Sequence, residues 1–134
     1  MDFSLTSDQN ELRALARQIL GDATSLERMK EVAATDSGTD LDLWRTMAEA
    51  GLVGIAMGEG VGGAGLGIIE ASVVLEEVGR TAARVPAFAV MGLAAPALAG
   101  RPELLAGVAS GDVIITAAIH EPCLLYTSDA ADDT

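Results

Sequence analysis

The sequence predicts an all-α fold: an orthogonal or up-down bundle of about six helices, with the first strand of a following β-domain at its carboxyl-terminal end. Three observations lead to this prediction. Apolar residues recur at helical spacing along most of the 134-residue chain. Half of the residues are hydrophobic but only 3% are aromatic, which favours closely packed helices over an aromatic-rich β-sandwich. A short β-branched run appears only near the end, at residues 113–119.

The first helix is predicted over about residues 7–20. Thr6 and Gln9 have the spacing of a capping box, in which each residue satisfies a backbone amide of the other. Apolar residues then follow at positions i, i+3, i+4, i+7 and i+8, which places one apolar stripe on the helix. Gly21 is predicted to end it, because glycine commonly terminates helices.

Two shorter helices are predicted next. A weak amphipathic pattern indicates a helix over about residues 24–34. Asp40 is predicted to cap a third helix that ends at Gly51. The expected buried face of this third helix consists of Leu43, Trp44, Met47 and Ala48.

Three more helices are predicted in the second half. A fourth covers about residues 66–78, and a fifth covers roughly 86–99, where Pro96 is expected to kink it or separate its end. A short sixth helix covers 102–109, with its proline in the first turn, where a missing N–H costs nothing.

The chain therefore divides into three parts. Residues 1–112 form a helical domain, and 113–122 begin a β-domain whose first strand has no partner in the preceding helices. We interpret residues 123–134 as a non-native cloning or sequencing scar, because "CLLYTSDAADD" resembles a translated transposase adapter. The alternative is a disordered acidic tail. On the first interpretation, the natural protein is expected to continue past Pro122.

Residues 57–67, "MGEGVGGAGLG", contain the dinucleotide-binding pattern G-x-G-x-x-G in two registers, which open at Gly58 and Gly60. The full fingerprint also needs a second strand that ends in an acidic residue, and the sequence after the fourth helix supplies neither. No Lys-Ser or Lys-Thr pair follows, as a nucleotide-hydrolase loop would require. We therefore interpret the glycines as a turn between the third and fourth helices, with phosphate binding as the less favoured alternative.

Charge and hydropathy exclude several classes of function. The formal net charge is -12 and the eight Lys and Arg residues are scattered, so no nucleic-acid surface is predicted. The longest uncharged apolar run, 85–99, is shorter than a membrane span and contains two prolines. The start, "MDFSLTSDQ", does not resemble a secretory leader, so a cytoplasmic location is expected. No metal site is predicted.

Three stretches in order carry a family resemblance: "MDFSLTSDQNELRALARQIL", "LWRTMAEAGLVGIAMGEGVGGAGLGIIEASVVLEEVGR" and "PELLAGVASGDVIITAAIHEP". Together they resemble the amino-terminal helical domain of acyl-CoA dehydrogenases over essentially all of residues 1–122. The most specific motifs are Gly51-Leu52-x-Gly54 leading to Gly62-Gly63-x-Gly65, Glu76-Glu77-x-Gly79-Arg80, and Glu121-Pro122.

The resemblance implies a flavoenzyme that desaturates acyl-CoA thioesters. In this family a carboxylate removes the α proton and hydride passes from the β carbon to FAD. The carboxylate lies in a later domain, so no catalytic residue is assigned here and the isolated fragment is expected to be inactive. The resemblance also implies an electron-transfer flavoprotein as acceptor, a homo- or hetero-oligomeric parent, and a place in bacterial fatty acid or sterol side-chain degradation.

The resemblance assigns candidate flavin contacts to Ala117, Ala118, Ile119 and His120. His120 departs from the threonine usual in the family. Its imidazole could still donate a hydrogen bond to the flavin edge. The alternatives are a histidine satisfied by backbone and a subunit that has lost flavin there.

The fourth helix contains three acidic residues, Glu70, Glu76 and Glu77. We interpret them as solvent-facing or paired with a neighbour such as Arg80, because acids on an apolar helix usually are.

Two departures from the family pattern concern small residues. Gly58-Glu59-Gly60 stands where the family commonly has Pro-Glu, which makes the loop looser. In the family the fourth and fifth helices wall the acyl pocket. The small residues of the fifth helix therefore either leave room for a broad substrate or serve core packing. They are Ala87, Ala89, Gly92 and Ala95.

Other functions stay open at this point. The chain could be a non-catalytic helical interaction module, although such a module has no use for the strand at 113–119. It could also belong to a base-lacking partner subunit of a heteromeric dehydrogenase. The same fold serves flavin-dependent acyl-CoA oxidases and related monooxygenases, which the helical domain does not separate.

Overall fold

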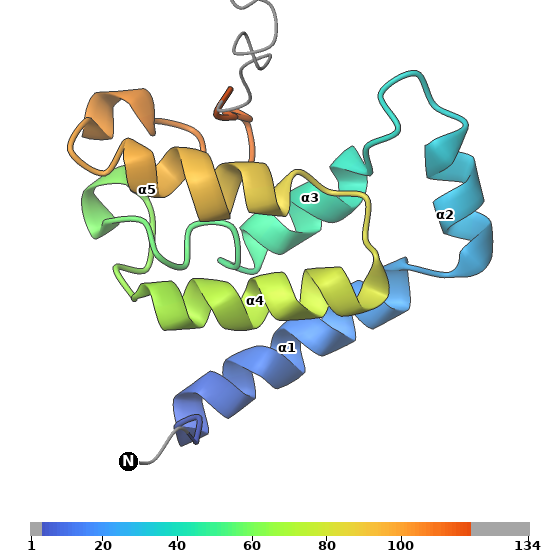
Figure 1. Ribbon diagram of the computed structural model, residues 1–134, viewed down its shortest axis with the longest axis horizontal. Coiled ribbons are helices and arrows are strands. Elements are labelled where there is room, and N and C mark those ends of the chain that lie inside the picture. The colour runs from blue at the N-terminus through green and yellow to red at the C-terminus, as the bar shows by residue number, and fades with distance from the viewer. Residues whose placement is uncertain (1–3, 119–134) are drawn as a thin grey trace, which may run out of the picture.

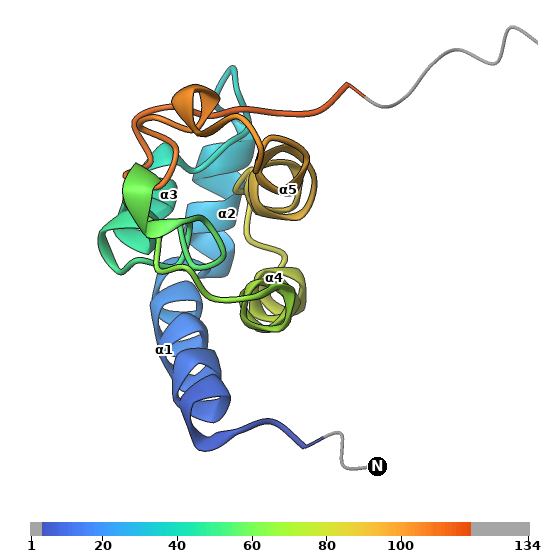
Figure 2. The same ribbon diagram turned by 90° about the vertical axis from the view of Figure 1, so that its left-hand side faces the viewer.

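The computed structural model describes residues 4–118, which form a bundle of helices (Figure 1). The longest helices, α1 and α4, pack against each other, and α1 also contacts α3. Figure 2 shows α4 and α5 on one side of the bundle and α1, α2 and α3 on the other. The helical elements are α1 (Ser7–Ala23), α2 (Leu26–Ala33), α3 (Leu41–Glu49), the 3₁₀ turn η1 (Glu59–Val61), α4 (Ile68–Thr81), the π-helical segment η2 (Phe88–Ala94), α5 (Ala95–Ala97) and the 3₁₀ turn η3 (Pro102–Leu104).

Local capping signals fix where the helices start. The Thr6 hydroxyl accepts a hydrogen bond from the Gln9 amide at 3.2 Å, and the Gln9 side chain accepts one from the Thr6 amide at 3.0 Å. The capping box expected for the first helix is therefore confirmed. Asp40 caps α3 by accepting a hydrogen bond from the Leu43 amide at 3.1 Å.

Gly21 does not end the first helix, contrary to the sequence prediction. The helix continues to Ala23, and the Thr24 hydroxyl closes its end by donating to the Leu20 carbonyl at 2.7 Å. A glycine inside a helix costs only about 1 kcal/mol relative to alanine. Leu20 is completely buried, so packing of this last turn outweighs that cost.

The core lies where the second half of α1 meets α3, α4 and η2. The four residues predicted for the buried face of the third helix are all buried. Their neighbours in the core come from all along the chain. The largest fully buried side chains are Trp44, Leu20, Met47, Leu52, Glu77, Val53, Val74, Val90 and Val108.

The fifth predicted helix is not a regular α-helix. Its first part, η2, has the wider turns of a π-helix, and the α-helical geometry resumes only at α5, where Pro96 occupies the first turn. Proline has no amide hydrogen to donate, so the helical hydrogen-bond ladder is interrupted at this position. The expectation that Pro96 disturbs the helix agrees with this change of geometry.

The sixth helix and the strand are not confirmed. Only residues 102–104 are helical, in η3, and the chain then turns at Gly107 and Gly111, whose φ values are +76° and +80°. Residues 113–118 have no regular secondary structure, although Ile115 still packs against the core, while residue 119 lies outside the described range. Strand pairing needs a second strand, and residues 4–118 contain none.

Within residues 4–118, none of the helices combines the length and the hydropathy that crossing a bilayer requires.

Candidate functional site

The glycine loop, residues 57–67, folds back on the segment before it. The amides of six successive residues, 61–66, donate to backbone carbonyls within 54–59; the bond from Gly65 to Met57, for example, measures 2.8 Å. A phosphate-binding loop must instead point free amides at its ligand. The geometry therefore supports the interpretation of this loop as a turn.

Some of the glycines are required by this turn. Gly62 and Gly65 have φ values of +83° and +67°, which favour glycine. A Cβ atom on Gly63 would overlap the carbonyl group of Met57, and one on Gly54 would lie 2.9 Å from the Cβ of Ala109. The fold thus explains these four glycines by backbone conformation and close approach.

An apolar pocket of about 280 Å³ lies between the glycine loop, the start of α4, and the helical stretch η2–α5. Methionines from two of these segments, Met57 and Met91, contribute to its wall. Its lining consists of Val53, Ile55, Ala56, Met57, Gly58, Gly60, Val61, Leu66, Ile68, Ala71, Met91, Ala95, Pro96, Ala99, Pro102 and Leu105. Apolar pockets of this kind are the usual sites for small organic ligands.

The small residues of the fifth predicted helix have different roles. Ala95 lines the pocket, so it contributes space to it. Ala87 is completely buried in the core and Ala89 is half-buried outside the lining. Gly92 lies beneath the ring of Phe88, where an added Cβ would be 3.0 Å from the ring. Core packing therefore accounts for Ala87, whereas room for a broad substrate stays a prediction.

Two acidic residues of α4, Glu76 and Glu77, form ion pairs with arginines of α1. Glu77 is buried, and it accepts hydrogen bonds from Arg17 at 2.7 and 3.1 Å and from Arg80 at 2.5 Å. Glu76 pairs with Arg13 at 2.8 Å. The expectation of pairing is confirmed, including the pair with Arg80, but Glu77 does not face solvent. Its main partner is on another helix.

The hydrogen bonds from Arg17, with a smaller contribution from Arg80, lower the pKa of Glu77 to about 2 against the opposing effect of burial. Glu77 is consequently ionised at neutral pH and has no proton to donate. Its carboxylate is occupied by two guanidinium groups, which suits a structural role better than acid–base catalysis.

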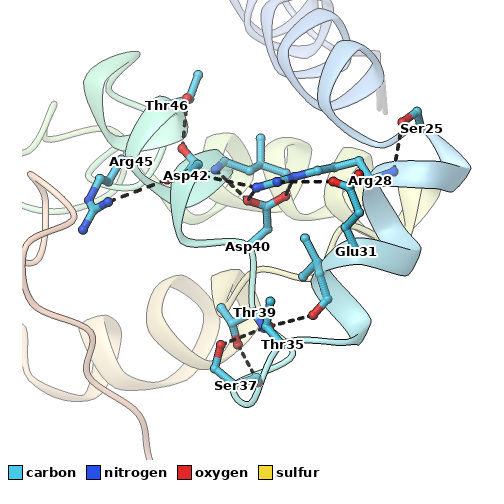
Figure 3. A network of polar contacts seen from close by, with 12 residues as sticks. Ser25, Arg28, Glu31, Thr35, Ser37, Thr39, Asp40, Asp42, Arg45 and Thr46 are labelled. Carbon is cyan, nitrogen blue, oxygen red and sulfur yellow. Dashed lines mark hydrogen bonds and ion pairs between the residues drawn. The ribbon is translucent and has the colours of Figure 1, made fainter.

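A second polar network ties α2 to α3 (Figure 3). Arg28 donates to both carboxylate oxygens of Asp40, at 2.8 and 3.0 Å, and to Asp42 at 3.3 Å. Its guanidinium holds the pKa of Asp40 below the ordinary value. The network lines a shallow polar hollow, but no group of acidic, histidine or cysteine residues within 4–118 could hold a metal ion.

Two of the four predicted flavin contacts lie within the residues that the structure describes. Ile119 and His120 are outside the described residues. Ala117 is half-buried and Ala118 is exposed, and the backbone of neither is hydrogen-bonded to the backbone of another described residue.

Comparison with known proteins gives a consistent picture. The family model "Acyl-CoA dehydrogenase, N-terminal domain" matches residues 6–111. The chain is 36% identical to "Acyl-CoA dehydrogenase FadE27" of Mycobacterium tuberculosis over 125 residues, which cover 89% of this chain and 34% of that protein.

Two solved structures have the same fold. The "Tcur3481-Tcur3483 steroid ACAD G363A variant" matches with a TM-score of 0.80 and 41% identity, over 85% of this chain and 33% of that one. The "ChsE4-ChsE5 complex from Mycobacterium tuberculosis" matches with a TM-score of 0.79 and 32% identity, over 91% and 36%. The chain thus spans about a third of the length of each of these relatives.

Proposed function

The chain belongs to the acyl-CoA dehydrogenase family, whose amino-terminal domain it forms, and we propose that its parent protein desaturates an acyl-CoA thioester between the α and β carbons. The observation that carries this proposal is the family match over residues 6–111, together with a TM-score of 0.80 to a solved relative. FAD, when bound, would accept the hydride released from the β carbon. No residue among those described is assigned to proton abstraction.

The part played by this chain is to build one wall of the active site. The apolar pocket lies between the glycine loop, the start of α4 and the η2–α5 stretch, and residues 113–118 contain two of the proposed flavin contacts. Ala117 and Ala118 would hold the flavin through backbone groups, with Ile119 and His120 completing the stretch. This assignment follows the family resemblance and the small size of the first two residues.

For the substrate, we propose a bulky acyl group of the kind met in sterol side-chain breakdown. The support is the solved relative described as a steroid enzyme, at 41% identity. Purified parent protein should turn over a steroid acyl-CoA with a higher kcat/KM than it shows for a straight-chain acyl-CoA. The reverse preference would contradict this substrate class.

The parent is proposed to act as an oligomer, with an electron-transfer flavoprotein as electron acceptor and a cytoplasmic location. The ChsE4–ChsE5 structure is a complex of two named proteins, and this favours one further candidate role, that of a base-lacking partner subunit in a heteromer. Assays of the parent alone and mixed with its partner separate the two roles. In a catalytic subunit, substitution of the base abolishes turnover. A base-lacking partner has no such residue, and it shows no turnover by itself.

The proposal is tested first by reading the coding sequence through Pro122. Further strands and a glycine-rich flavin loop are expected there, and a natural stop codon would contradict the proposal. The 134-residue chain by itself is expected to bind no measurable FAD and to show no acyl-CoA turnover, because the base and most of the flavin site belong to the rest of the parent. A yellow, active preparation of the chain would refute that expectation.

A further inference from the structure

We propose that the last turn of α4, residues 79–82, is a hinge that exchanges between two helix ends. In the structure the helix is closed by Ala82, which takes up the left-handed conformation. In the second form the helix would end three residues earlier, with Gly79 in the left-handed conformation and the residues after it no longer helical. This hinge belongs to the described residues alone and does not depend on the proposed function.

Ala82 occupies a conformation that favours glycine. Its φ and ψ are +51° and +33°, and within residues 4–118 it is the one residue other than glycine with a positive φ. An L-residue is strained there because its Cβ comes close to the following carbonyl oxygen. Helices that end in a left-handed residue usually have glycine at that position. The end of α4 is therefore less stable with alanine than it would be with glycine.

Gly79 shows the opposite mismatch. It lies inside α4 without a positive φ, where only proline is less favoured than glycine. A Cβ atom at this position would meet nothing within 4 Å, so no close contact requires a glycine. In the second form Gly79 adopts the left-handed conformation without steric cost, and Ala82 is released from it. The earlier helix end thus relieves both mismatches.

The last turn is held by hydrogen bonds near the surface. None of residues 79–82 is buried, so no side chain anchors the turn in the core. The amides of Ala82 and Ala83 donate to carbonyls of α4 at 3.2 and 3.3 Å, at the long end of the usual range. The Thr81 hydroxyl donates to two more carbonyls, at 3.1 and 3.2 Å. Water can replace bonds of this kind, and such segments open locally while the rest of the protein stays folded.

Both sides of the turn are firmly held, so the opening is confined to it. On one side Glu77 is buried, and it keeps its hydrogen bonds from Arg17 when Arg80 is released. On the other side the Arg84 carbonyl accepts a hydrogen bond of 2.7 Å from the Asp40 amide, and the residues before and after it pack against the core.

Opening of the turn creates slack between α4 and η2. Figure 1 shows the yellow linker that connects the end of α4 to η2, which begins at Phe88. A helical residue spans about 1.5 Å and an extended one about 3.3 Å, so residues 79–82 gain about 7 Å when they uncoil. This slack lets η2, together with the linker bound to Asp40, shift relative to α4. Hinges are commonly a few residues at the end of an element that absorb changes in φ and ψ.

Amide hydrogen exchange of the 134-residue chain, followed by NMR, measures the opening directly. The amides of Ala82 and Ala83 should exchange at least about 100-fold faster than those of residues 73–75, in the middle of α4, because a local opening exposes only the former. Equal exchange rates would show that the turn opens only when the whole chain unfolds, and would overturn the proposal.

Gly79→Ala separates the hinge from ordinary fraying of a helix end. Alanine favours the helix and also disfavours the left-handed second form, so exchange at Ala82 and Ala83 should slow at least about tenfold. Gly21→Ala is the matched control, because Gly21 also lies inside a helix with open space around its Cβ position. It should slow exchange at the end of α1 by only about threefold to fivefold, and leave the end of α4 unchanged. Equal slowing at the two helix ends would contradict the second form.

Ala82→Gly tests the strain at the present helix end. Glycine ordinarily makes a chain more flexible, but here it relieves a left-handed alanine in the helical form. We therefore expect exchange at the amides of residues 82 and 83 to slow by about threefold or more. Faster exchange in this variant would mean that Ala82 is not strained, and would overturn the proposal.

Relaxation-dispersion NMR tests whether the movement reaches η2. We expect the second form to be populated at about 1–10% and to exchange on the microsecond to millisecond timescale. The methyl group of Met91, on η2, should show the same exchange rate as residues 79–83, whereas Met47, on α3, should show none. Gly79→Ala should abolish the exchange at both places. A Met91 signal without exchange, or exchange that Gly79→Ala leaves unchanged, would contradict the hinge.

Discussion

Glu77 on α4 and Arg17 on α1 form a two-point ion pair across the longest helix interface, with the Arg17 Nη2 and Glu77 Oε1 atoms 2.7 Å apart. The carboxylate is buried while the guanidinium is about half exposed. The pair therefore keeps a buried charge satisfied from the surface of the neighbouring helix. Arg80 provides the second partner of the same carboxylate, from the next turn of α4.

Glu77→Gln should lower the free energy of unfolding by about 2–3 kcal/mol, because it removes charged hydrogen bonds from a buried site. Urea unfolding followed by the fluorescence of Trp44, the one tryptophan in the sequence, measures this. Glu76→Gln is the matched control. Its side chain is 63% exposed, so a change within about 0.5 kcal/mol is expected. Equal effects of the two substitutions would show that burial of Glu77 has no energetic consequence.

The stability of the chain should fall in acid, and Glu77 should account for part of the fall. Its folded-state pKa of about 2 lies below the ordinary value of 4.5, so its ionised form stabilises the folded state. That contribution is complete above about pH 4.5 and is lost as the pH falls toward about 2. Urea unfolding between pH 6 and pH 2.5 should therefore show a smaller decrease in Glu77→Gln than in the unsubstituted chain. Parallel curves would contradict the assignment.

Asp40 should tolerate asparagine better than alanine. Its carboxylate caps α3 through the Leu43 amide and also binds Arg28. Asparagine keeps a capping oxygen and loses the charge, whereas alanine loses both interactions. We expect Asp40→Ala to cost about 1–2 kcal/mol for the cap alone, with a further loss from Arg28, and Asp40→Asn to cost less. A larger loss in the asparagine variant, measured by thermal unfolding, would be inconsistent with capping.

The glycines of the loop should separate into two groups on substitution by alanine. Gly63→Ala places a Cβ inside the Met57 carbonyl, where only a backbone shift relieves the overlap, so we expect a loss above about 3 kcal/mol or failure to fold. Gly58→Ala should be neutral or stabilising by about 0.4–1 kcal/mol, because its backbone conformation suits alanine. Circular dichroism melting curves compare the two variants. Similar melting temperatures would refute the distinction.

Signals that act within a few residues could be interpreted from the sequence. The capping box at Thr6, the cap at Asp40 and the buried face around Trp44 were all predicted correctly, because each depends on neighbours one or two helical turns away. The family resemblance likewise followed from the order and spacing of short motifs, and the match over residues 6–111 confirms it.

The tertiary structure decided what depends on distant segments. Packing of Leu20 extends α1 past Gly21. The expected pairing of Glu77 with Arg80 is present, but its burial and its pairing with Arg17, 60 residues away in sequence, depend on the contact between α1 and α4. The pocket is likewise assembled from the glycine loop, α4 and η2–α5. No local pattern specifies which segments meet, since burial and ion pairing are properties of the packed arrangement. The sequence therefore determined the helix caps, the buried face of α3 and the family, and the fold determined where the helices end and which glycines the turn needs.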